Sequence, residues 1–172
     1  SVAEIGVFGG SGFYSLLENV TEVKVDTPYG PPSDAVMLAE VGGRKVAFLP
    51  AMVDTNDPPA QDQLPRECVG DAQAWREGDH QPVSGGSLQA HIEPGSFLVA
   101  DQFVDRTSGR ADTFYDGPIV RHFSPADMYD ETLRQLAVET IKEHGIVAHD
   151  GGTVVVIQGP RFSTKSESQW FT

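Results

Sequence analysis

A short apolar run that ends in a glycine-rich turn constrains the fold of this chain most. Residues Ile5–Phe8 form the run, and Gly9-Gly10-Ser11-Gly12 follow it directly. This pattern predicts a buried strand that stops at a tight turn. Two further apolar runs, at 97–100 and 154–157, are bounded by glycine or polar residues in the same way. They too are expected to be buried strands.

A hairpin and a long helix complete the expected elements. Residues 36–38 and 46–49 flank Gly42-Gly43, which predicts the hairpin. The helix is expected to begin with Ser124 as N-cap and to stop at Gly145. Its buried stripe would comprise Leu133, Leu136, Ala137, Thr140 and Ile141. Strands that alternate with helix and end in glycine turns predict an α/β fold. With 172 residues, a single domain over 1–172 is expected.

Charge and composition exclude several classes of function. The chain has 25 acidic and 12 basic side chains, and a net charge of −13 disfavours nucleic-acid and anionic-membrane partners. No apolar run approaches the roughly 18–20 residues that span a bilayer, and no secretory signal pattern is present. The single Cys68 excludes an internal disulfide and a thiolate metal site. We therefore expect a soluble, cytoplasmic protein that acts on small molecules.

The segment 51–83 departs from the rest of the chain. It shows no sustained apolar period of either kind, and Asp, Gln and Pro are clustered in it. Interpreted alone, it is a loop of about thirty residues, which is unusual in a compact domain.

Two loops carry candidate binding residues. In the first, the backbone around Gly10 and the hydroxyl of Ser11 could cradle an anion, although a plain turn between strand and helix explains the same residues. The second loop, 158–164, follows an expected strand at the edge where open α/β sheets place ligands. There Phe162 could stack on a flat ring and Ser163 could bond to its edge, or Phe162 could be an incidental core residue.

Two other features have structural interpretations. The polar run Asp101–Thr107 is expected to form a turn held by its acids and Arg106. His122 is a lone histidine, and such residues are more often structural than catalytic.

An ordered series of motifs resembles one family. The series covers residues 1–50 and 84–172, and it comprises Ile5–Tyr14, Asp26-Thr27-Pro28-Tyr29-Gly30, Gly86-Ser87-Leu88, Asp101–Thr107, Phe114-Tyr115-Asp116-Gly117 and Gly159–Thr164. In this order they resemble S-methyl-5′-thioadenosine phosphorylases of the trimeric purine nucleoside phosphorylase class. The resemblance implies a mixed central sheet flanked by helices, a homotrimer, and no metal or organic cofactor.

The resemblance also implies a reaction. Inorganic phosphate, as co-substrate, would attack the ribosyl carbon of S-methyl-5′-thioadenosine and give adenine and 5-methylthioribose 1-phosphate, a step of purine and methionine salvage. By position, Gly10, Ser11, Val83 and Ser84 would bind phosphate, and His122, Phe162 and Ser163 would bind the nucleoside. Relatives that prefer 6-oxopurines usually carry glutamate at the position of Ser163, so serine favours adenine-type substrates. A phosphorylase of inosine or guanosine is the alternative within the family.

The sequence departs from the family in two places. The family has an Arg-His-Gly phosphate motif where this chain has Ala51-Met52-Val53, and alanine cannot make the bidentate contact of arginine. The family also continues beyond the equivalent of residue 172, with a ribose-binding methionine and the aspartate that protonates the purine. No catalytic residue can therefore be assigned, and a catalytically dead remnant of the family is a further alternative.

A shifted reading frame explains the segment 51–83 as a hypothesis. Back-translation of 51–57 in a neighbouring frame gives His-Gly-Arg-His-Glu-Arg, and that of 60–73 gives a family-like helical sequence. Small insertions or deletions in the gene or in its sequencing would produce both. Re-reading the DNA across codons 50–85 tests the hypothesis, because an unchanged frame would exclude a sequencing error.

Overall fold

The computed structural model describes residues 3–9, 19–27, 32, 34–50, 79–80, 82–110, 113, 115, 117–122 and 124–172. The chain forms two compact units, which are described separately. The first comprises Ser1–Ser84 with Arg110–Phe114, and the second Gly85–Gly109 with Tyr115–Thr172. The glycine turn from Gly10 onward and residues 51–78 of the atypical segment lie outside the described residues.

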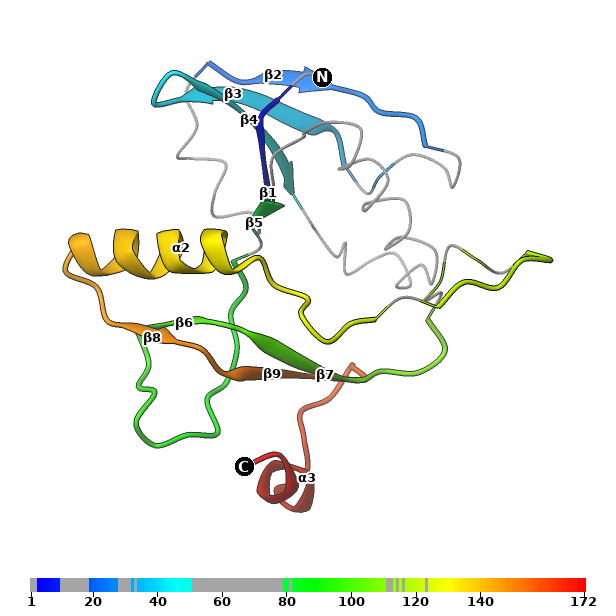
Figure 1. The fold of residues 1–172 in the computed structure, drawn as a ribbon, viewed down its shortest axis with the longest axis vertical. Coiled ribbons are helices and arrows are strands. Elements are labelled where there is room, and N and C mark those ends of the chain that lie inside the picture. The colour runs from blue at the N-terminus through cyan, green and yellow to red at the C-terminus, as the bar shows by residue number, and fades with distance from the viewer. Residues whose placement is uncertain are drawn as a thin grey trace. The chain divides into compact units, whose positions relative to one another are not determined.

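The first unit holds a five-stranded mixed sheet (Figure 1). Its strands are β1 (Ile5–Gly9), β2 (Thr21–Val23), β3 (Val36–Val41), β4 (Arg44–Pro50) and β5 (Asp79–His80), in the order β2-β3-β4-β1-β5. The β2–β3 and β3–β4 pairs are antiparallel, while β1 pairs in parallel with both β4 and β5. The predicted strand at 5–8 is confirmed, and β5 lies unexpectedly within the atypical segment.

The predicted hairpin is also confirmed. Val41 pairs with Arg44 around the two-residue turn Gly42-Gly43. These glycines have φ values of 58° and 79°. A turn with positive φ at both central residues matches the right-handed twist of the flanking strands, and glycine adopts it without steric cost.

The core of the first unit packs against its central strands. Buried side chains form one cluster, with Val25 and Leu38 packed against it: Ala3, Phe8, Val36, Ala47 and Leu49. β1 is apolar over its whole length and none of its residues is exposed, with Gly6, Phe8 and Gly9 buried and Ile5 and Val7 half-buried. A strand shielded from solvent on both faces is a continuous apolar run rather than an alternating one.

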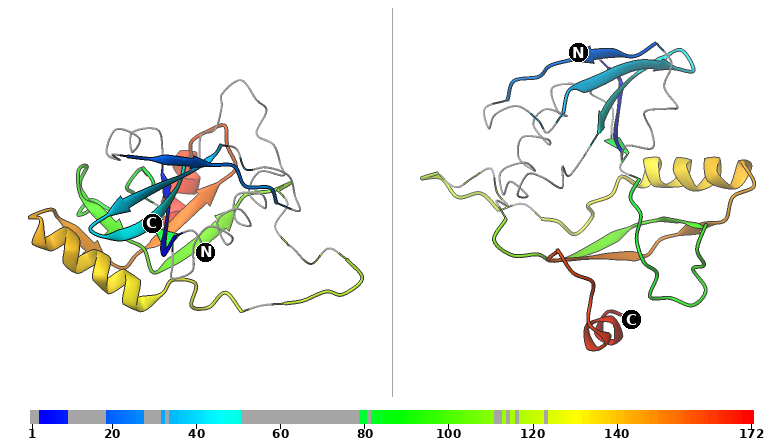
Figure 2. Two further views of the ribbon diagram at one scale, coloured as in Figure 1. Left: turned by 90° about the horizontal axis from the view of Figure 1, so that it is seen from above. Right: turned by 180° about the vertical axis from the view of Figure 1, so that it is seen from behind.

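The second unit holds a parallel ladder in two pieces, seen from two further sides in Figure 2. β6 (Phe97–Val99) pairs with β8 (Ala148–Asp150), and β7 (Gln102–Arg106) pairs with β9 (Thr153–Ile157). The register does not shift across the interruption, since Val99 pairs with Asp150 and Gln102 with Thr153. The predicted strands at 97–100 and 154–157 are confirmed, but the prediction that they are buried is wrong, since Phe97 is 48% exposed and Val156 is 39% exposed. The prediction of a turn over 101–107 is wrong, because residues 102–106 form strand β7, which pairs with β9.

Two glycines form the interruption of this ladder. Gly151 has a φ of 85° and Gly152 a φ of 150°. A Cβ on Gly152 would lie 2.9 Å from Leu98 Cδ1, so the Leu98 side chain would have to shift to admit it. The Gly152 N–H donates instead to Asp101 Oδ1 at 2.9 Å. Glycine is therefore favoured chiefly by the positive φ of both residues, and a side chain at 152 would in addition displace Leu98.

Helix α2 (Glu131–Glu143) packs on β8 and β6, and it begins later than predicted. Its N-cap is Asp130, whose carboxylate accepts from Leu133 N at 2.9 Å. The prediction of Ser124 as N-cap is wrong. The Ala126 carbonyl accepts from Gln102 Nε2 at 2.7 Å, so this part of the backbone is bonded to β7 rather than within a helix.

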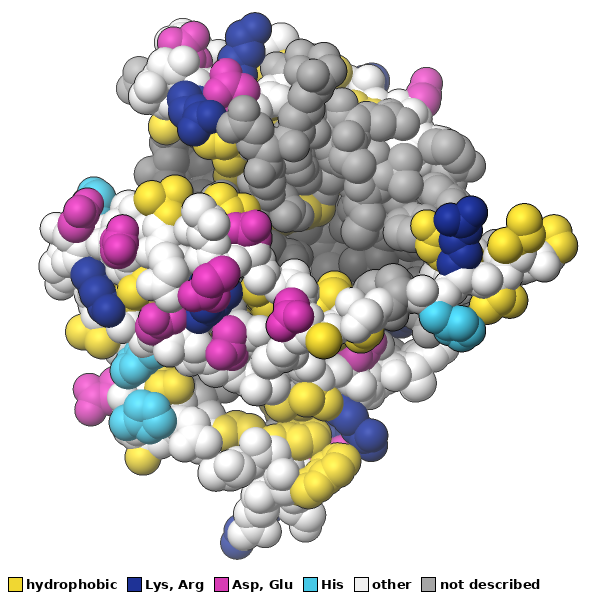
Figure 3. Space-filling view, in the orientation of Figure 1, with side chains coloured by type: hydrophobic (Ala, Val, Ile, Leu, Met, Phe, Trp, Pro, Cys, Tyr) yellow, Lys and Arg dark blue, Asp and Glu magenta, His cyan; other side chains and the backbone are white. Residues whose placement is uncertain are grey.

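The buried face of α2 also differs from the predicted stripe. Arg134 and Val138 are its buried residues, whereas Leu136 is 55% exposed. The hydrophobic pattern of the helix does not predict this face, because it places arginine in solvent. Arg134 is buried instead, and its charge is compensated by polar partners. Acidic side chains are frequent over the part of the surface where α2 lies, as Figure 3 shows. The acids of the helix and its cap are all exposed: Asp130, Glu131, Glu139 and Glu143.

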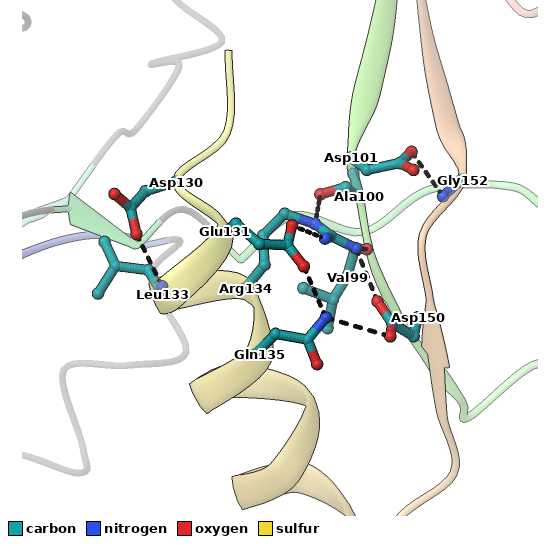
Figure 4. Close-up of polar contacts among 10 residues, drawn as sticks. All are labelled: Val99, Ala100, Asp101, Asp130, Glu131, Leu133, Arg134, Gln135, Asp150 and Gly152. Atoms are coloured by element: carbon teal, nitrogen blue, oxygen red, sulfur yellow. Dashed lines mark hydrogen bonds and ion pairs between the residues drawn. The ribbon is translucent and has the colours of Figure 1, made fainter. Parts of the chain in front are cut away.

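The partners of Arg134 join α2 to the broken ladder (Figure 4). Its guanidinium donates to the Ala100 carbonyl at 2.9 Å, to Asp150 Oδ1 at 2.7 Å and to Glu131. Burial opposes the charge of Arg134, but its bonds with Glu131 and Asp150 outweigh burial and raise its pKa. Hydrogen bonds from Gln135 and Arg134 lower the pKa of Glu131. The network thus remains charged at neutral pH.

A second helix, α3 (Lys165–Phe171), follows β9 and was not predicted. Its signal is present in the sequence, since Thr164 and Glu167 have the spacing of a capping box. Within the described part of the chain, no helix is long and apolar enough to cross a bilayer.

Candidate active site

The carboxyl ends of β7 and β9 bring two predicted motifs together. Because these strands are parallel and Arg106 pairs with Ile157, the residues that follow each strand emerge at the same edge. The Gln158 side chain accepts a hydrogen bond from Ser108 N at 3.0 Å, which joins the two loops. At this edge Asp105 Oδ1 accepts from Thr107 N at 2.7 Å, and Arg106 lies 5.0 Å from the centre of the Trp170 ring.

A single ion pair spans the loop from Arg161 to the first turn of α3. Arg161 Nη1 lies 2.7 Å from Glu167 Oε2, and Nη2 lies 2.8 Å from Oε1, so the pair is bidentate. The same Nη1 donates to the Phe162 carbonyl at 3.0 Å. Glu167 also accepts from Thr164 N at 2.7 Å, and Thr164 Oγ1 accepts from Glu167 N at 3.2 Å. We call the three residues Arg161, Thr164 and Glu167 the loop clamp.

The electrostatics of the loop clamp favour its ionised form. Hydrogen bonding from Arg161, followed by that from the Thr164 backbone, lowers the pKa of Glu167 from its ordinary 4.5 to about 2. The hydrogen bonds to Glu167 raise the pKa of Arg161 in turn. The clamp is therefore a full ion pair at any pH near neutrality.

Phe162 and Ser163 lie between the clamped residues and differ in exposure. Phe162 is 96% exposed, so its ring makes almost no contact within the chain. Ser163 is half-buried, and its Oγ lies 2.8 Å from Ser168 Oγ. The interpretation of Phe162 as an incidental core residue is wrong. A free aromatic face beside a hydroxyl is an arrangement that can receive a flat heterocycle.

The other predicted site residues are placed as follows. His122 is exposed at the end of the described segment 117–122, which also carries the exposed Ile119 and Val120. Val83 is 73% exposed and Ser84 is exposed; both belong to the first unit, whereas His122 belongs to the second. Gly10 and Ser11 lie outside the described residues. Among the described members of the predicted set, Phe162 and Ser163 are neighbours in one loop, as Val83 and Ser84 are in another segment.

Metal ligands do not gather in the described part of the chain. Among those residues, no group of three or more His, Cys, Asp or Glu side chains could hold a metal ion. The residues that sequence reasoning missed are Glu167 and Ser108, the first of which the capping-box spacing from Thr164 would have identified.

Comparison with known proteins identifies the family of the part of the chain that forms this edge. The family model described as "Phosphorylase superfamily" matches residues 84–172, the part of the chain that holds both loops. A purine nucleoside phosphorylase of Streptomyces coelicolor is 47% identical over 98% of this chain. An S-methyl-5′-thioadenosine phosphorylase of Thermofilum pendens is 43% identical over 96% of it.

Solved structures agree with the fold. A methylthioadenosine phosphorylase from an antarctic soil metagenomic library superposes with a TM-score of 0.91 at 32% identity, covering 99% of this chain and 61% of its own. The Schistosoma mansoni methylthioadenosine phosphorylase in complex with adenine gives 0.84 at 28% identity, covering 98% of this chain and 69% of its own. The α/β nucleoside-phosphorylase fold predicted from the sequence is confirmed.

This chain covers only part of the length of the relatives it matches. This chain spans 63% of the Streptomyces coelicolor relative and 64% of the Thermofilum pendens relative. Over that extent the sequence match, the family model and the fold all agree. The chain belongs to the Phosphorylase superfamily.

Proposed function

We propose that this protein is a pentosyltransferase that cleaves S-methyl-5′-thioadenosine with inorganic phosphate. The products are adenine and 5-methylthioribose 1-phosphate, so the enzyme would act in the cytoplasm in purine and methionine salvage, and we propose that it does so as a homotrimer. The observation that carries the proposal is the exposed Phe162 ring beside Ser163, held at the carboxyl edge of a sheet in a phosphorylase fold.

The reaction asks little covalent chemistry of the protein. A phosphate oxygen forms a bond to the ribosyl C1′, the bond from C1′ to the purine nitrogen breaks, and its electron pair leaves with the purine, which takes up a proton. Catalysis then depends on holding phosphate, stabilising positive charge on the sugar and accepting the leaving base. No metal or organic cofactor is required for these steps, and inorganic phosphate is the co-substrate.

Each predicted residue has one task in this scheme. Gly10 and Ser11, with Val83 and Ser84, would bind phosphate, and His122 would lie near the 5′ substituent of the sugar. Phe162 would stack on the purine and Ser163 would contact its edge. The group that protonates the purine is unassigned.

The edge of the purine decides between two substrate classes. N1 of adenine is an acceptor and matches a hydroxyl donor such as Ser163, whereas N1–H of a 6-oxopurine is a donor and matches a carboxylate. Ser163 therefore favours S-methyl-5′-thioadenosine. The 47% identity to a purine nucleoside phosphorylase favours inosine or guanosine instead, and this is the second candidate function.

Release of free base from both nucleosides tests the proposal. The purified protein is incubated with S-methyl-5′-thioadenosine or inosine, with and without phosphate, and the bases are separated chromatographically. We expect phosphate-dependent release of adenine, faster than release of hypoxanthine. The Ser163→Glu variant should reverse that preference, and Phe97→Leu, which lies on β6, serves as a control of unchanged preference.

Three results would contradict the proposal in different ways. Faster release of hypoxanthine by the unmodified protein would support the second candidate. Binding of either nucleoside without release of base would identify a catalytically dead remnant. Release of adenine that does not depend on phosphate would indicate hydrolysis, a different reaction.

A further inference from the structure

The loop that carries Phe162 and Ser163 is tied down on both sides. Before it, Gln158 is bonded to Ser108 across the ladder at 3.0 Å. After it, Thr164 caps α3, and Glu167 returns a bond to the Thr164 backbone at 2.7 Å. Only five residues separate these two anchors in the sequence, namely Gly159, Pro160, Arg161, Phe162 and Ser163.

Arg161 fixes the peptide group next to the exposed ring. Its Nη1 donates to both the Phe162 carbonyl, at 3.0 Å, and Glu167, at 2.7 Å. The direction of the Phe162 carbonyl sets the plane of the peptide that joins Phe162 to Ser163. The backbone from which both side chains project is thus oriented by one guanidinium.

Glu167 links the two ends of the same short stretch. Its Oε2 is shared between the Arg161 guanidinium and the Thr164 N–H, at 2.7 Å each. Phe162 and Ser163 are the two residues between Arg161 and Thr164. Charge-assisted and bidentate bonds of this kind are directional as well as strong, so they restrict orientation.

Global stability does not account for this arrangement. The side chains of Arg161 and Glu167 are 47% and 31% exposed, and exposed ion pairs contribute little to folding. Helix α3 buries none of its residues, so no core of its own depends on the clamp. The consequence of the clamp is therefore local geometry.

We infer that Arg161 and Glu167 are positioning residues, which hold the Phe162 ring and the Ser163 hydroxyl in the orientation that receives the purine. This inference rests on the proposed function, because it assigns the purine to those two residues. Neither residue of the pair needs to touch the substrate. Their contribution is to reduce the freedom that the loop must lose on binding.

Steady-state kinetics on three variants test the inference. Arg161→Met removes all three bonds of the guanidinium, Glu167→Gln removes the charge, and Arg161→Lys keeps the charge without the bidentate geometry. For Arg161→Met we expect KM for S-methyl-5′-thioadenosine to rise about tenfold, one 1.4 kcal/mol step, with a smaller change in kcat. Glu167→Gln and Arg161→Lys should give intermediate values of KM.

A matched control and a structural readout complete the design. Arg44→Met breaks another exposed ion pair, the single contact of Arg44 Nε with Glu4 Oε2 at 2.9 Å in the first unit, and should leave KM unchanged. Amide hydrogen exchange at Thr164 and Glu167 reports the clamp without any reaction. It should accelerate in Arg161→Met and stay constant in Arg44→Met.

The outcomes separate the two hypotheses. If exchange accelerates while KM of an active enzyme stays constant, the positioning inference is wrong and the proposed function stands. If the unmodified protein binds nucleoside without turnover, the dissociation constant replaces KM and the same comparison decides. If the unmodified protein neither binds nor cleaves any nucleoside, both the proposed function and the inference are overturned.

Discussion

Two arginines in the second unit make the same kind of contact in opposite surroundings. Arg134 is 8% exposed and joins α2 to the broken ladder through Glu131, Asp150 and two backbone carbonyls. The Arg161 side chain is 47% exposed and joins a loop to a seven-residue helix through Glu167. Each pairs with carboxylates, yet only Arg134 also satisfies carbonyls at the place where a ladder is interrupted.

The difference in burial predicts that one arginine stabilises the fold and that the other orients a loop. Removing a buried donor leaves acceptors without partners, and this destabilises the fold because water cannot reach them to form new hydrogen bonds. Removing an exposed donor lets water take its place, so the fold is little affected while the local conformation is freed. We therefore expect Arg134 to matter for folding and Arg161 for the orientation of Phe162.

The largest expected effect is that of Arg134→Met. The Ala100 carbonyl would lose its partner, while the Val99 carbonyl would keep the bond from Gly151 N at 3.0 Å, so the free energy of unfolding should fall by about 1–3 kcal/mol. Equilibrium unfolding in urea measures it. The exposed pair Arg44–Glu4 gives the control, since Arg44→Met should cost less than about 1 kcal/mol. Equal losses in the two variants would abolish the distinction drawn between buried and exposed arginines.

A second test changes the interruption itself. In Gly152→Ala the new Cβ would lie 2.9 Å from Leu98 Cδ1 and the φ of 150° would be retained only under strain. We expect a loss of about 1–2 kcal/mol in urea unfolding, of the size found for strained backbone positions. Gly117→Ala is the control, because a Cβ there meets nothing within 4 Å. If both glycines tolerate alanine equally, the interruption is not a rigid part of the Arg134 network.

Local patterns predicted local structure, and contacts distant in sequence decided the rest. The hairpin at Gly42-Gly43 followed from its turn residues alone. The start of α2 did not, because Gln102 holds the Ala126 carbonyl from 24 residues away and Asp130 then caps the helix. Burial of Arg134 depends on Asp150, which no helical period can reveal.

The candidate site was predictable in its residues but not in its arrangement. Phe162 and Ser163 were identified from a glycine-proline loop after an apolar run, and the structure places them side by side. The exposure of Phe162 could not be predicted from the sequence. Burial is predicted from a repeating pattern of apolar residues, and a single aromatic residue in a loop has no such pattern. The helix α3 was missed although Thr164 and Glu167 have capping-box spacing.

Lowering the pH is expected to have a smaller effect, which acts through Glu167, the partner of the exposed Arg161. The pKa of Glu167 is about 2 in the folded protein against an ordinary 4.5, so the ion pair stabilises the loop at any pH above 4.5. That stabilisation should be lost progressively as the pH falls from 4.5 through about 2. A carbon-detected NMR titration of the Glu167 carboxyl measures the midpoint. In Arg161→Met the midpoint should move up toward the ordinary value, and an unmoved midpoint would mean that Arg161 is not the main cause.

The smallest effect on folding is expected at Phe162, where the largest effect on binding is also expected. The ring is 96% exposed, so Phe162→Ala should change the free energy of unfolding by no more than about 0.5 kcal/mol. Loss of a base-stacking aromatic costs about 1–3 kcal/mol of binding where such stacking occurs, which corresponds to a rise in KM for the nucleoside of roughly 5- to 150-fold. Phe162→Tyr, which keeps the aromatic face, should restore KM. Destabilisation of the protein by Phe162→Ala would place the ring in a core, and an unchanged KM would remove Phe162 from the proposed site. Either result would break the contrast between the Arg134 network, which stabilises the fold, and the loop clamp, which is proposed to orient a purine-binding loop.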